Sequence, residues 1–180
     1  MTIAENKLQE NIAEYVLYVW QMQDLLRSVA LNEGELYVKM GLSDANDPEQ
    51  KEREWLKSLA KKMKNEGLEK SGNVMEVETI LAELFYLHNT LISILKDTKY
   101  IQLFELTEPN IKGLMEKSDG NQNLIHHTLI ALYGWLILRM QKSEISTETT
   151  DAMKSFSKLM AYLSAKYKEM KTGELNSAKN

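Results

Sequence analysis

The chain has 180 residues, of which 43% are hydrophobic and 27% are charged, a composition that suits one globular domain with a sizeable core. Two prolines and eight glycines are too few for the many short turns of a β-sandwich or barrel, whereas good helix formers are abundant. The net charge of -4 gives no overall attraction to nucleic acid or an anionic membrane, and the absence of cysteine excludes disulfides, thiolate metal ligands and Cys nucleophiles. We therefore predict an all-α protein, a single helical bundle of five to seven helices over residues 1–180, with about 172–180 as a frayed tail.

The N-terminal sequence MTIAENKLQENIAEY contains several acidic residues and no apolar stretch before a small-residue cleavage site, so it does not resemble a secretory signal. The longest apolar stretch, residues 129–140, is shorter than the roughly 20 residues that cross a bilayer, and it contains Arg139. We expect a cytoplasmic protein with no membrane partner.

The first predicted helix covers about residues 3–31. Its apolar side chains recur at alternating spacings of three and four and share one face: Ile12, Tyr15, Val19, Met22, Leu26 and Val29. Further apolar residues widen this stripe and predict contact with more than one neighbouring helix. Residues 32–46 contain two glycines, and we expect a connection there with about one helical turn near residues 36–40.

A second helix is predicted from Asp47 to about Glu66. Asp47 is the expected N-cap, Pro48 fits the first helical position, and Gln50 completes a capping box. Gly67 stands where the helix is expected to end. The expected inward side chains are Trp55, Leu56, Leu59, Ala60 and Met63.

The third predicted helix, about residues 73–97, has the most regular apolar pattern in the chain. Its seam consists of Val74, Val77, Leu81, Leu84, His88, Leu91 and Leu95. The fourth segment, residues 100–117, is predicted to form two short helical pieces, because Pro109 lacks a backbone donor and disfavours helix at Glu108.

The fifth predicted helix, about residues 121–142, contains an uncharged run from Leu129 to Leu138. The sixth begins near Ser146 or Thr147, either of which can cap it. Its apolar stripe consists of Met153, Phe156, Leu159 or Met160, Leu163 and Tyr167. We expect the first, third and fifth helices to be the most buried.

Two adjacent histidines, His126 and His127, lie at the start of the fifth helix. Neighbours in a helix point about 100° apart, so the pair cannot converge on one metal ion without ligands from other helices. His127 aligns with Ala131 and Gly134, and because a glycine inside a helix costs about 1 kcal/mol relative to alanine, we expect a close helix contact at Gly134. The expected role of both histidines is structural, with a metal or catalytic role as the alternative.

His88 is the stronger functional candidate, because an ionisable group inside an apolar seam must be neutral or paired. The expected role of His88 is nevertheless that of a core histidine bonded to a tyrosine or to a backbone carbonyl, with a place in a functional site as the alternative. Tyrosines and tryptophans spread over several helices could line a pocket for a planar ligand, or serve as core and boundary residues. The candidate pocket residues are His88, His126, Tyr133 and Trp20.

The sequence contains no catalytic, cofactor or metal motif that we recognise. The Glu-x-x-His pairs of di-metal helical bundles are absent, as are His-Glu-x-x-His, Gly-x-Ser-x-Gly, a Walker loop and a dinucleotide fingerprint. We therefore assign no catalytic residue and expect no cofactor and no tightly bound transition metal. A basic cluster in the second helix alternates with glutamates and indicates a solvated face rather than a nucleic-acid site: Arg53, Lys57, Lys61, Lys62 and Lys64.

Three segments carry a family resemblance: NIAEYVLYVWQMQDLLR at 11–27, ELFYLH at 83–88 and LIALYGWLILRMQKSEISTET at 129–149. On these segments the chain resembles a bacterial family of uncharacterised all-helical proteins of about 180 residues, a domain of unknown function. The resemblance covers essentially the whole chain and implies no activity and no catalytic residue.

For function, we expect a non-catalytic interaction or scaffold protein that self-associates. The alternative is a helical-bundle binder of a small apolar or aromatic ligand, and the third class is an enzyme without a recognisable motif. The broad apolar face of the first helix and the small residues Ala131 and Gly134 of the fifth predict a symmetric homodimer. An additional protein partner is left open, and nucleic acid is not expected to bind.

Overall fold

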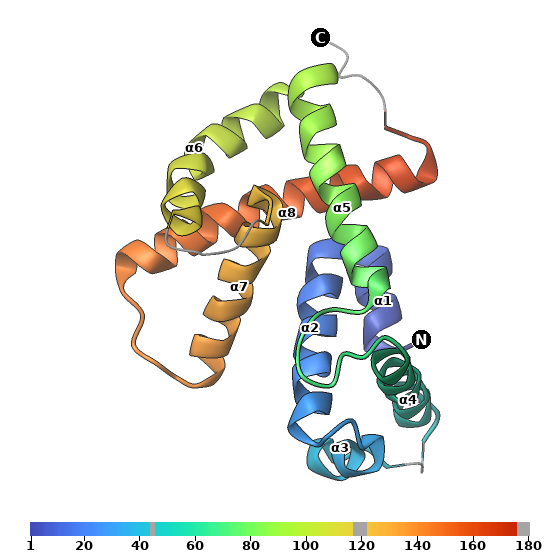
Figure 1. Cartoon of the computed structure of the whole chain (residues 1–180). Coiled ribbons are helices and arrows are strands. Elements are labelled where there is room, and N and C mark those ends of the chain that lie inside the picture. The colour runs from blue at the N-terminus through green and yellow to red at the C-terminus, as the bar shows by residue number, and fades with distance from the viewer. Residues whose placement is uncertain (44–45, 117–121, 176–180) are drawn as a thin grey trace. The chain divides into compact units, whose positions relative to one another are not determined.

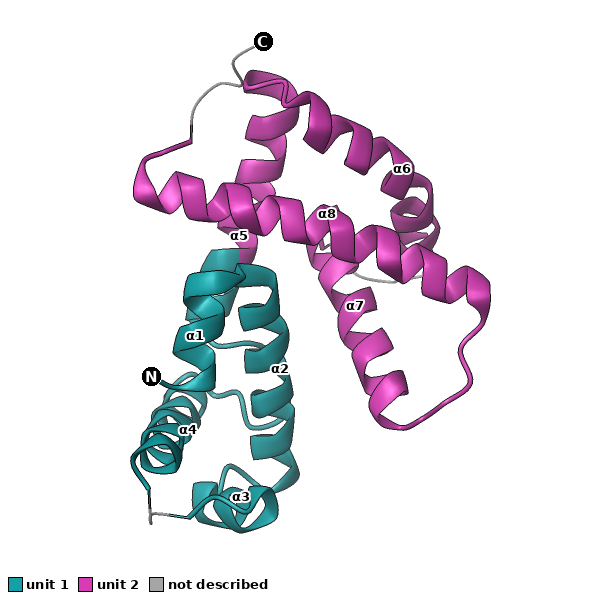
Figure 2. Cartoon of the chain, turned by 180° about the vertical axis from the view of Figure 1, so that it is seen from behind, with its two compact units in different colours: residues 1–80 teal, residues 81–180 magenta. Residues whose placement is uncertain are grey.

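The computed structural model describes residues 1–43, 46–116 and 122–175, and within these ranges it contains eight α-helices, one π-helix and no strand (Figure 1). The all-α prediction is confirmed, although eight helices exceed the expected five to seven. The chain divides into two compact units, Met1–Ile80 and Leu81–Asn180, with the boundary inside helix α5 (Figure 2). The expectation of a single domain stays a prediction.

The first unit contains α1 (Ile3–Glu10), α2 (Ile12–Ser28), α3 (Glu33–Met40) and α4 (Asp47–Asn65). The prediction of one long helix over residues 3–31 is wrong, because Asn11 separates α1 from α2. Asn11 has an extended backbone, and its Oδ1 accepts hydrogen bonds from the N–H groups of Ala13 and Glu14. It therefore caps α2, as asparagine commonly does at a helix start.

Helix α3 replaces the single turn expected near residues 36–40, and helix α4 begins with a different cap from the predicted one. Asn46, not Asp47, is the N-cap, because its extended backbone lets its Oδ1 accept from the N–H of Glu49 at 3.0 Å. Of the expected inward side chains, Leu56, Leu59, Ala60 and Met63 are buried and Trp55 is half-buried. Gly67 follows the helix in the left-handed conformation, with φ of 69°, as predicted.

A buried carboxylate joins three helices of the first unit. Glu52 of α4 is 5% exposed and accepts a hydrogen bond from the hydroxyl of Tyr18 in α2 at 2.5 Å. Its second oxygen accepts from the backbone N–H of Ile3 at the start of α1, at 3.0 Å. Both oxygens thus have donors, which a buried carboxylate requires to remain stable.

Helix α5 (Met75–Asn89) continues into the π-helix η1 (Thr90–Ile94). Six of the seven predicted seam positions, from Val74 to Leu91, are buried, and Leu95 is half-buried. The predicted end of this helix at about residue 97 is only approximately right. The π-helix η1 stops at Ile94, and Lys96 has a positive φ of 51°.

Helix α6 (Thr98–Met115) passes through Pro109 without interruption, so the prediction of two short pieces is wrong. Proline removes only one helical hydrogen bond, the one to the carbonyl of Glu105. Thr107 and Ile111, on either side of the proline, are 1% exposed, and this tertiary packing holds the helix together. The expected end of this helix at Lys117 lies outside the described residues.

Helices α7 (Leu124–Met140) and α8 (Thr147–Thr172) complete the second unit. Ser146 caps α8, and every predicted residue of its apolar stripe is buried, as expected. The prediction that the fifth helix is among the most buried is wrong for its C-terminal half, because the described buried residues of α7 end at Leu132. Helix α8 ends at Thr172, and Gly173 follows in the left-handed conformation; the predicted frayed tail falls largely on residues 176–180, outside the described residues.

Candidate functional site

His88 lies near the C-terminal end of α5, inside the second unit, and is 3% exposed. Its Nδ1 is 2.8 Å from the hydroxyl of Tyr100, a fully buried residue of α6. The structure therefore favours the core histidine bonded to a tyrosine, one of the two roles considered for this residue.

The surroundings of His88 keep its imidazole neutral. The rings of Phe85 and Phe104 lie with centroids 6.1 and 4.8 Å from the imidazole. Burial lowers the pKa of His88 to about 4, against a smaller opposing effect of the Glu108 carboxylate. Burial likewise raises the pKa of Tyr100 well above its ordinary value. At neutral pH the two side chains form an uncharged pair that joins α5 to α6.

A second polar group of this unit surrounds Asp97, the N-cap of α6. Its Oδ1 accepts a hydrogen bond from the N–H of Tyr100 at 3.0 Å. The hydroxyl of Tyr162 in α8 lies 3.0 Å from both carboxylate oxygens, and the ammonium of Lys166 lies 3.7 Å from Oδ2. Because Tyr100 belongs to α6 and both Tyr162 and Lys166 belong to α8, Asp97 connects these two helices.

The other candidate pocket residues belong to two helices, α2 and α7. Trp20 is buried in α2 of the first unit, whereas His126 and Tyr133 are half-buried positions of α7. The backbone N–H of His126 donates to Oδ1 of Asn123, the N-cap of α7, at 3.0 Å. None of these residues, nor His88, lines either of the two hollows described below. Their assignment to a pocket stays a prediction.

His127, the neighbour of His126, is 5% exposed, and its Nδ1 lies 3.0 Å from the backbone carbonyl oxygen of Asn123. Within the described residues, no three His, Asp or Glu side chains are grouped so that they could hold a metal ion. None of the helices in the described ranges combines the length and apolarity needed to cross a membrane.

The C-terminal half of α7 exposes apolar surface. Leu138 and Met140 are 40% and 57% exposed, and Ile130, in the preceding half of the helix, is 42% exposed. Gly134 is also exposed, and a Cβ added there would meet no atom within 4 Å, so the close helix contact expected at this glycine is absent from the described part of the chain. Figures 1 and 2 show this half of α7 running away from α6 and α8, toward the loop that leads back to α8.

Three of these positions form one row along α7. Ile130, Gly134 and Leu138 are spaced by four residues, which places them along a single ridge of the helix. All three are exposed, and the ridge carries an apolar side chain at each end and an open position in the middle. We call these three residues the α7 row.

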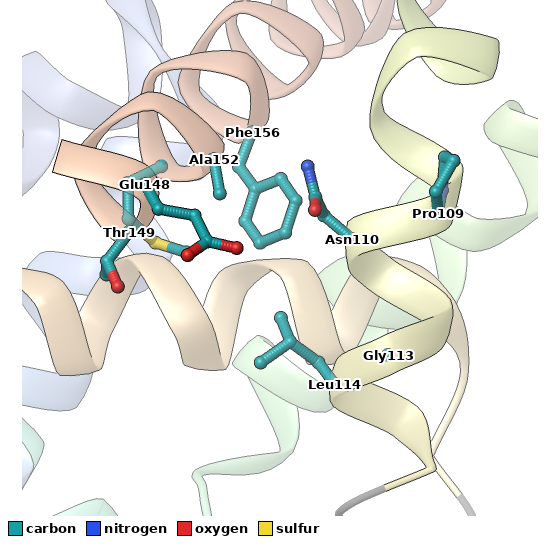
Figure 3. A pocket seen from close by; sticks show the side chains of 9 residues that line it. Pro109, Asn110, Gly113, Leu114, Glu148, Thr149, Ala152 and Phe156 are labelled. Carbon is teal, nitrogen blue, oxygen red and sulfur yellow. The ribbon is translucent and has the colours of Figure 1, made fainter. Parts of the chain in front are cut away.

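A hollow of about 390 Å³, open to solvent, lies between α6 and α8 (Figure 3). Its wall on α6 consists of Pro109, Asn110, Gly113 and Leu114, and its wall on α8 of Glu148, Thr149, Ala152, Met153 and Phe156. Glu148 and Asn110 extend into it from opposite walls, as Figure 3 shows. We call it the α6–α8 hollow.

The α6 wall of this hollow is built from residues that weaken a helix. Pro109 and Gly113 reduce helix stability by about 3 and 1 kcal/mol relative to alanine. They stand four positions apart, and both line the hollow. Nothing lies within 4 Å of a Cβ added at Gly113, so the missing side chain leaves this space open. Sequence reasoning missed this hollow, because a Pro–Gly pair within one helix does not indicate which other helix lies opposite it.

A smaller hollow of about 230 Å³ also lies between α6 and α8. Its lining includes Asp151 and Lys154, whose side chains already form an ion pair at 3.1 Å. The charges of this second hollow are therefore partly compensated within the chain.

Comparison with known proteins identifies one family. The model of a family described as Domain of unknown function (DUF4924) matches residues 1–174. No curated protein and no solved structure matches the chain.

Proposed function

The chain belongs to the DUF4924 family, which has no assigned activity, and we propose that it is a non-catalytic interaction protein of the bacterial cytoplasm that self-associates as a homodimer. The observation that carries this proposal is the exposed α7 row. The sequence of α7 has one charged residue, Arg139, in 17 positions. A helix that is apolar around its circumference is stable in water only where its surface is covered.

The single charge of α7 does not interrupt this surface. The guanidinium of Arg139 lies over the ring of Trp135, 4.9 Å from its centroid. An arginine stacked in this way covers the aromatic face and keeps its charge at the edge of the apolar surface. Arginine and tryptophan are both enriched in protein interfaces relative to the rest of the protein surface.

A second copy of the chain fits the α7 row better than an unrelated partner does, because the row is complementary to itself. When two copies cross in antiparallel orientation at Gly134, Leu138 of each copy meets Ile130 of the other. The missing side chains at the two glycines let the helix backbones approach closely at the two-fold axis. The same contact is made twice, so both apolar ends of the row are covered at once.

The alternative of a helical binder of a small apolar ligand has less support. Such sites enclose most of the ligand surface. Both hollows between α6 and α8 are open to solvent.

Light scattering after size-exclusion chromatography tests the proposal. We expect the wild-type mass to rise from 20.8 kDa toward twice this value as concentration increases through the micromolar range. Leu138→Glu places a charge in the row and should leave a folded monomer. Val38→Glu is the matched control, since Val38 of α3 is 83% exposed and lies in the first unit, and it should dimerise like the wild type. A mass of 20.8 kDa at every concentration, or equal dimerisation of Leu138→Glu, contradicts the proposal.

A further inference from the structure

The α6–α8 hollow combines an apolar interior with a single charged group. The apolar lining consists of Leu114, Ala152, Met153 and Phe156, of which Phe156 is fully buried. Glu148 is the one ionisable residue among the nine that line the hollow. The local charge is therefore negative at neutral pH.

The Glu148 carboxylate has no partner among the described residues. No ion pair or hydrogen bond of its side chain occurs there, whereas the nearest lysine of α6 along the chain, Lys112, is already paired with Glu108 at 2.9 Å. The side-chain amide of Asn110, across the hollow, also makes no hydrogen bond with a described residue. The carboxylate and the Asn110 carbonyl oxygen are thus two acceptors that extend into one space.

An anion is a poor occupant of this hollow, although it lies close to the first turn of α8. The Oγ of Ser146 accepts the N–H of Thr149 at 3.1 Å, so this helix-terminal donor is already used. The carboxylate of Glu148 repels a second negative charge. A positively charged group does not need the N–H donors of the helix start, and the Glu148 carboxylate attracts it.

We propose that the α6–α8 hollow binds the side chain of a lysine from a partner polypeptide. The four-carbon stem of lysine packs along apolar walls while its ammonium, which has three donors and no acceptor, reaches the two oxygen acceptors. The hollow is at the lower end of the volumes of small-molecule sites and is open on one side, which lets the partner backbone stay outside. Gly113 provides the room for the stem, because it places no side chain in the hollow.

This site is independent of the dimer contact. The α6–α8 hollow and the α7 row share no residue, so a protein that failed to dimerise would still bind lysine here. A failure of the dimer proposal therefore does not imply that lysine binding fails, and the reverse also holds.

Amide chemical-shift titration of the full chain tests the site, with the peptide acetyl-Ala-Ala-Lys-Ala-Ala-amide as the probe. We expect saturable shifts at Gly113 and Ala152, and at least about tenfold weaker binding when norleucine replaces the lysine, because the charge-assisted hydrogen bonds are lost. Butylammonium serves as the free-amine probe. If butylammonium bound as tightly as the peptide, the proposal that the lysine comes from a polypeptide would be contradicted.

Two variants and one control complete the test. Glu148→Gln keeps the shape of the side chain and removes its charge, and Gly113→Leu fills the hollow with a better helix former; both should weaken peptide binding about tenfold or more. Glu105→Gln removes the same charge from an exposed position of α6 outside the hollow and should bind like the wild type. Circular dichroism verifies that each variant is folded. Equal binding by Glu148→Gln and wild type, or equal binding of the norleucine peptide, refutes the proposal.

Discussion

Two regions of the second unit differ in how polarity relates to burial. One is the interior formed by α5, α6 and α8, and the other is the C-terminal half of α7. The interior contains polar side chains, His88, Asp97 and Tyr100, yet each has a hydrogen-bond partner and is at most 6% exposed. The end of α7 is almost entirely apolar, yet Leu138 and Met140 are at least 40% exposed. Apolar content alone therefore does not determine what is buried; the spacing of apolar residues and the partners available to polar ones do.

The largest expected difference between the two regions is in the effect of shortening a leucine. Leu163→Ala in α8 removes a fully buried side chain and should lower the free energy of unfolding by about 2–5 kcal/mol. Leu138→Ala in α7, at a position 40% exposed, should change it by about 0.5 kcal/mol or less at concentrations where the chain is monomeric. Urea denaturation of both variants measures the difference. Comparable losses would mean that the end of α7 is part of the interior.

Acid should destabilise the interior through His88. Its pKa of about 4 in the folded protein lies below the ordinary 6.5, so between these pH values the unfolded chain binds a proton that the folded chain does not. Stability should consequently fall as the pH decreases from 6.5 to 4, by up to about 3 kcal/mol from this group. The double variant His88→Leu, Tyr100→Phe lacks this contribution, and the difference between the two pH profiles isolates it. Parallel profiles would show that water reaches His88.

Removing only one polar group of the His88–Tyr100 pair should lower the free energy of unfolding more than removing both. His88→Leu leaves the fully buried hydroxyl of Tyr100 without its partner and should cost about 1–3 kcal/mol of stability at pH 7. Adding Tyr100→Phe should recover most of this loss. A single variant as stable as the wild type would indicate that the Tyr100 hydroxyl finds another partner.

A small effect of opposite sign is expected at Gly134. Gly134→Ala should raise the stability of the monomer by up to about 1 kcal/mol, because the position is helical and a Cβ there meets nothing within 4 Å. In the dimer the added methyl lies at the crossing point and should weaken association. Thermal unfolding at low concentration and light scattering at high concentration separate the two effects. If Gly134→Ala associated like the wild type, the two α7 helices would not cross at Gly134.

Much of the fold could be predicted because periodicity and capping are local. The stripe of α8, its Ser146 cap and the seam of α5 follow directly from residue spacing. The errors occur where two local signals compete or where tertiary packing decides. Asn11 divides the first helix because its side chain satisfies backbone donors, and Pro109 is tolerated because buried neighbours hold α6 together.

The candidate surfaces were less predictable than the helices. His88 was identified from its place in an apolar seam, but its partner Tyr100 is twelve positions away and on another helix. The α6–α8 hollow is lined by residues of two segments, 109–114 and 148–156, that are at least 34 positions apart, and no local pattern relates them. The exposure of Ile130 and Leu138 depends on which side chains of other helices cover them, which the apolar run itself does not encode.

Intermolecular nuclear Overhauser effects in a sample that mixes isotope-labelled and unlabelled chains test most directly whether a second copy covers the α7 row. We predict contacts between the methyl groups of Ile130 in one chain and Leu138 in the other, on both sides of Gly134. Their loss in Leu138→Glu, with the signals of Val38→Glu unchanged, would confirm the assignment. A dimer whose intermolecular contacts all lie on other helices, or the absence of any such contact at concentrations where the wild type is a dimer, would contradict it.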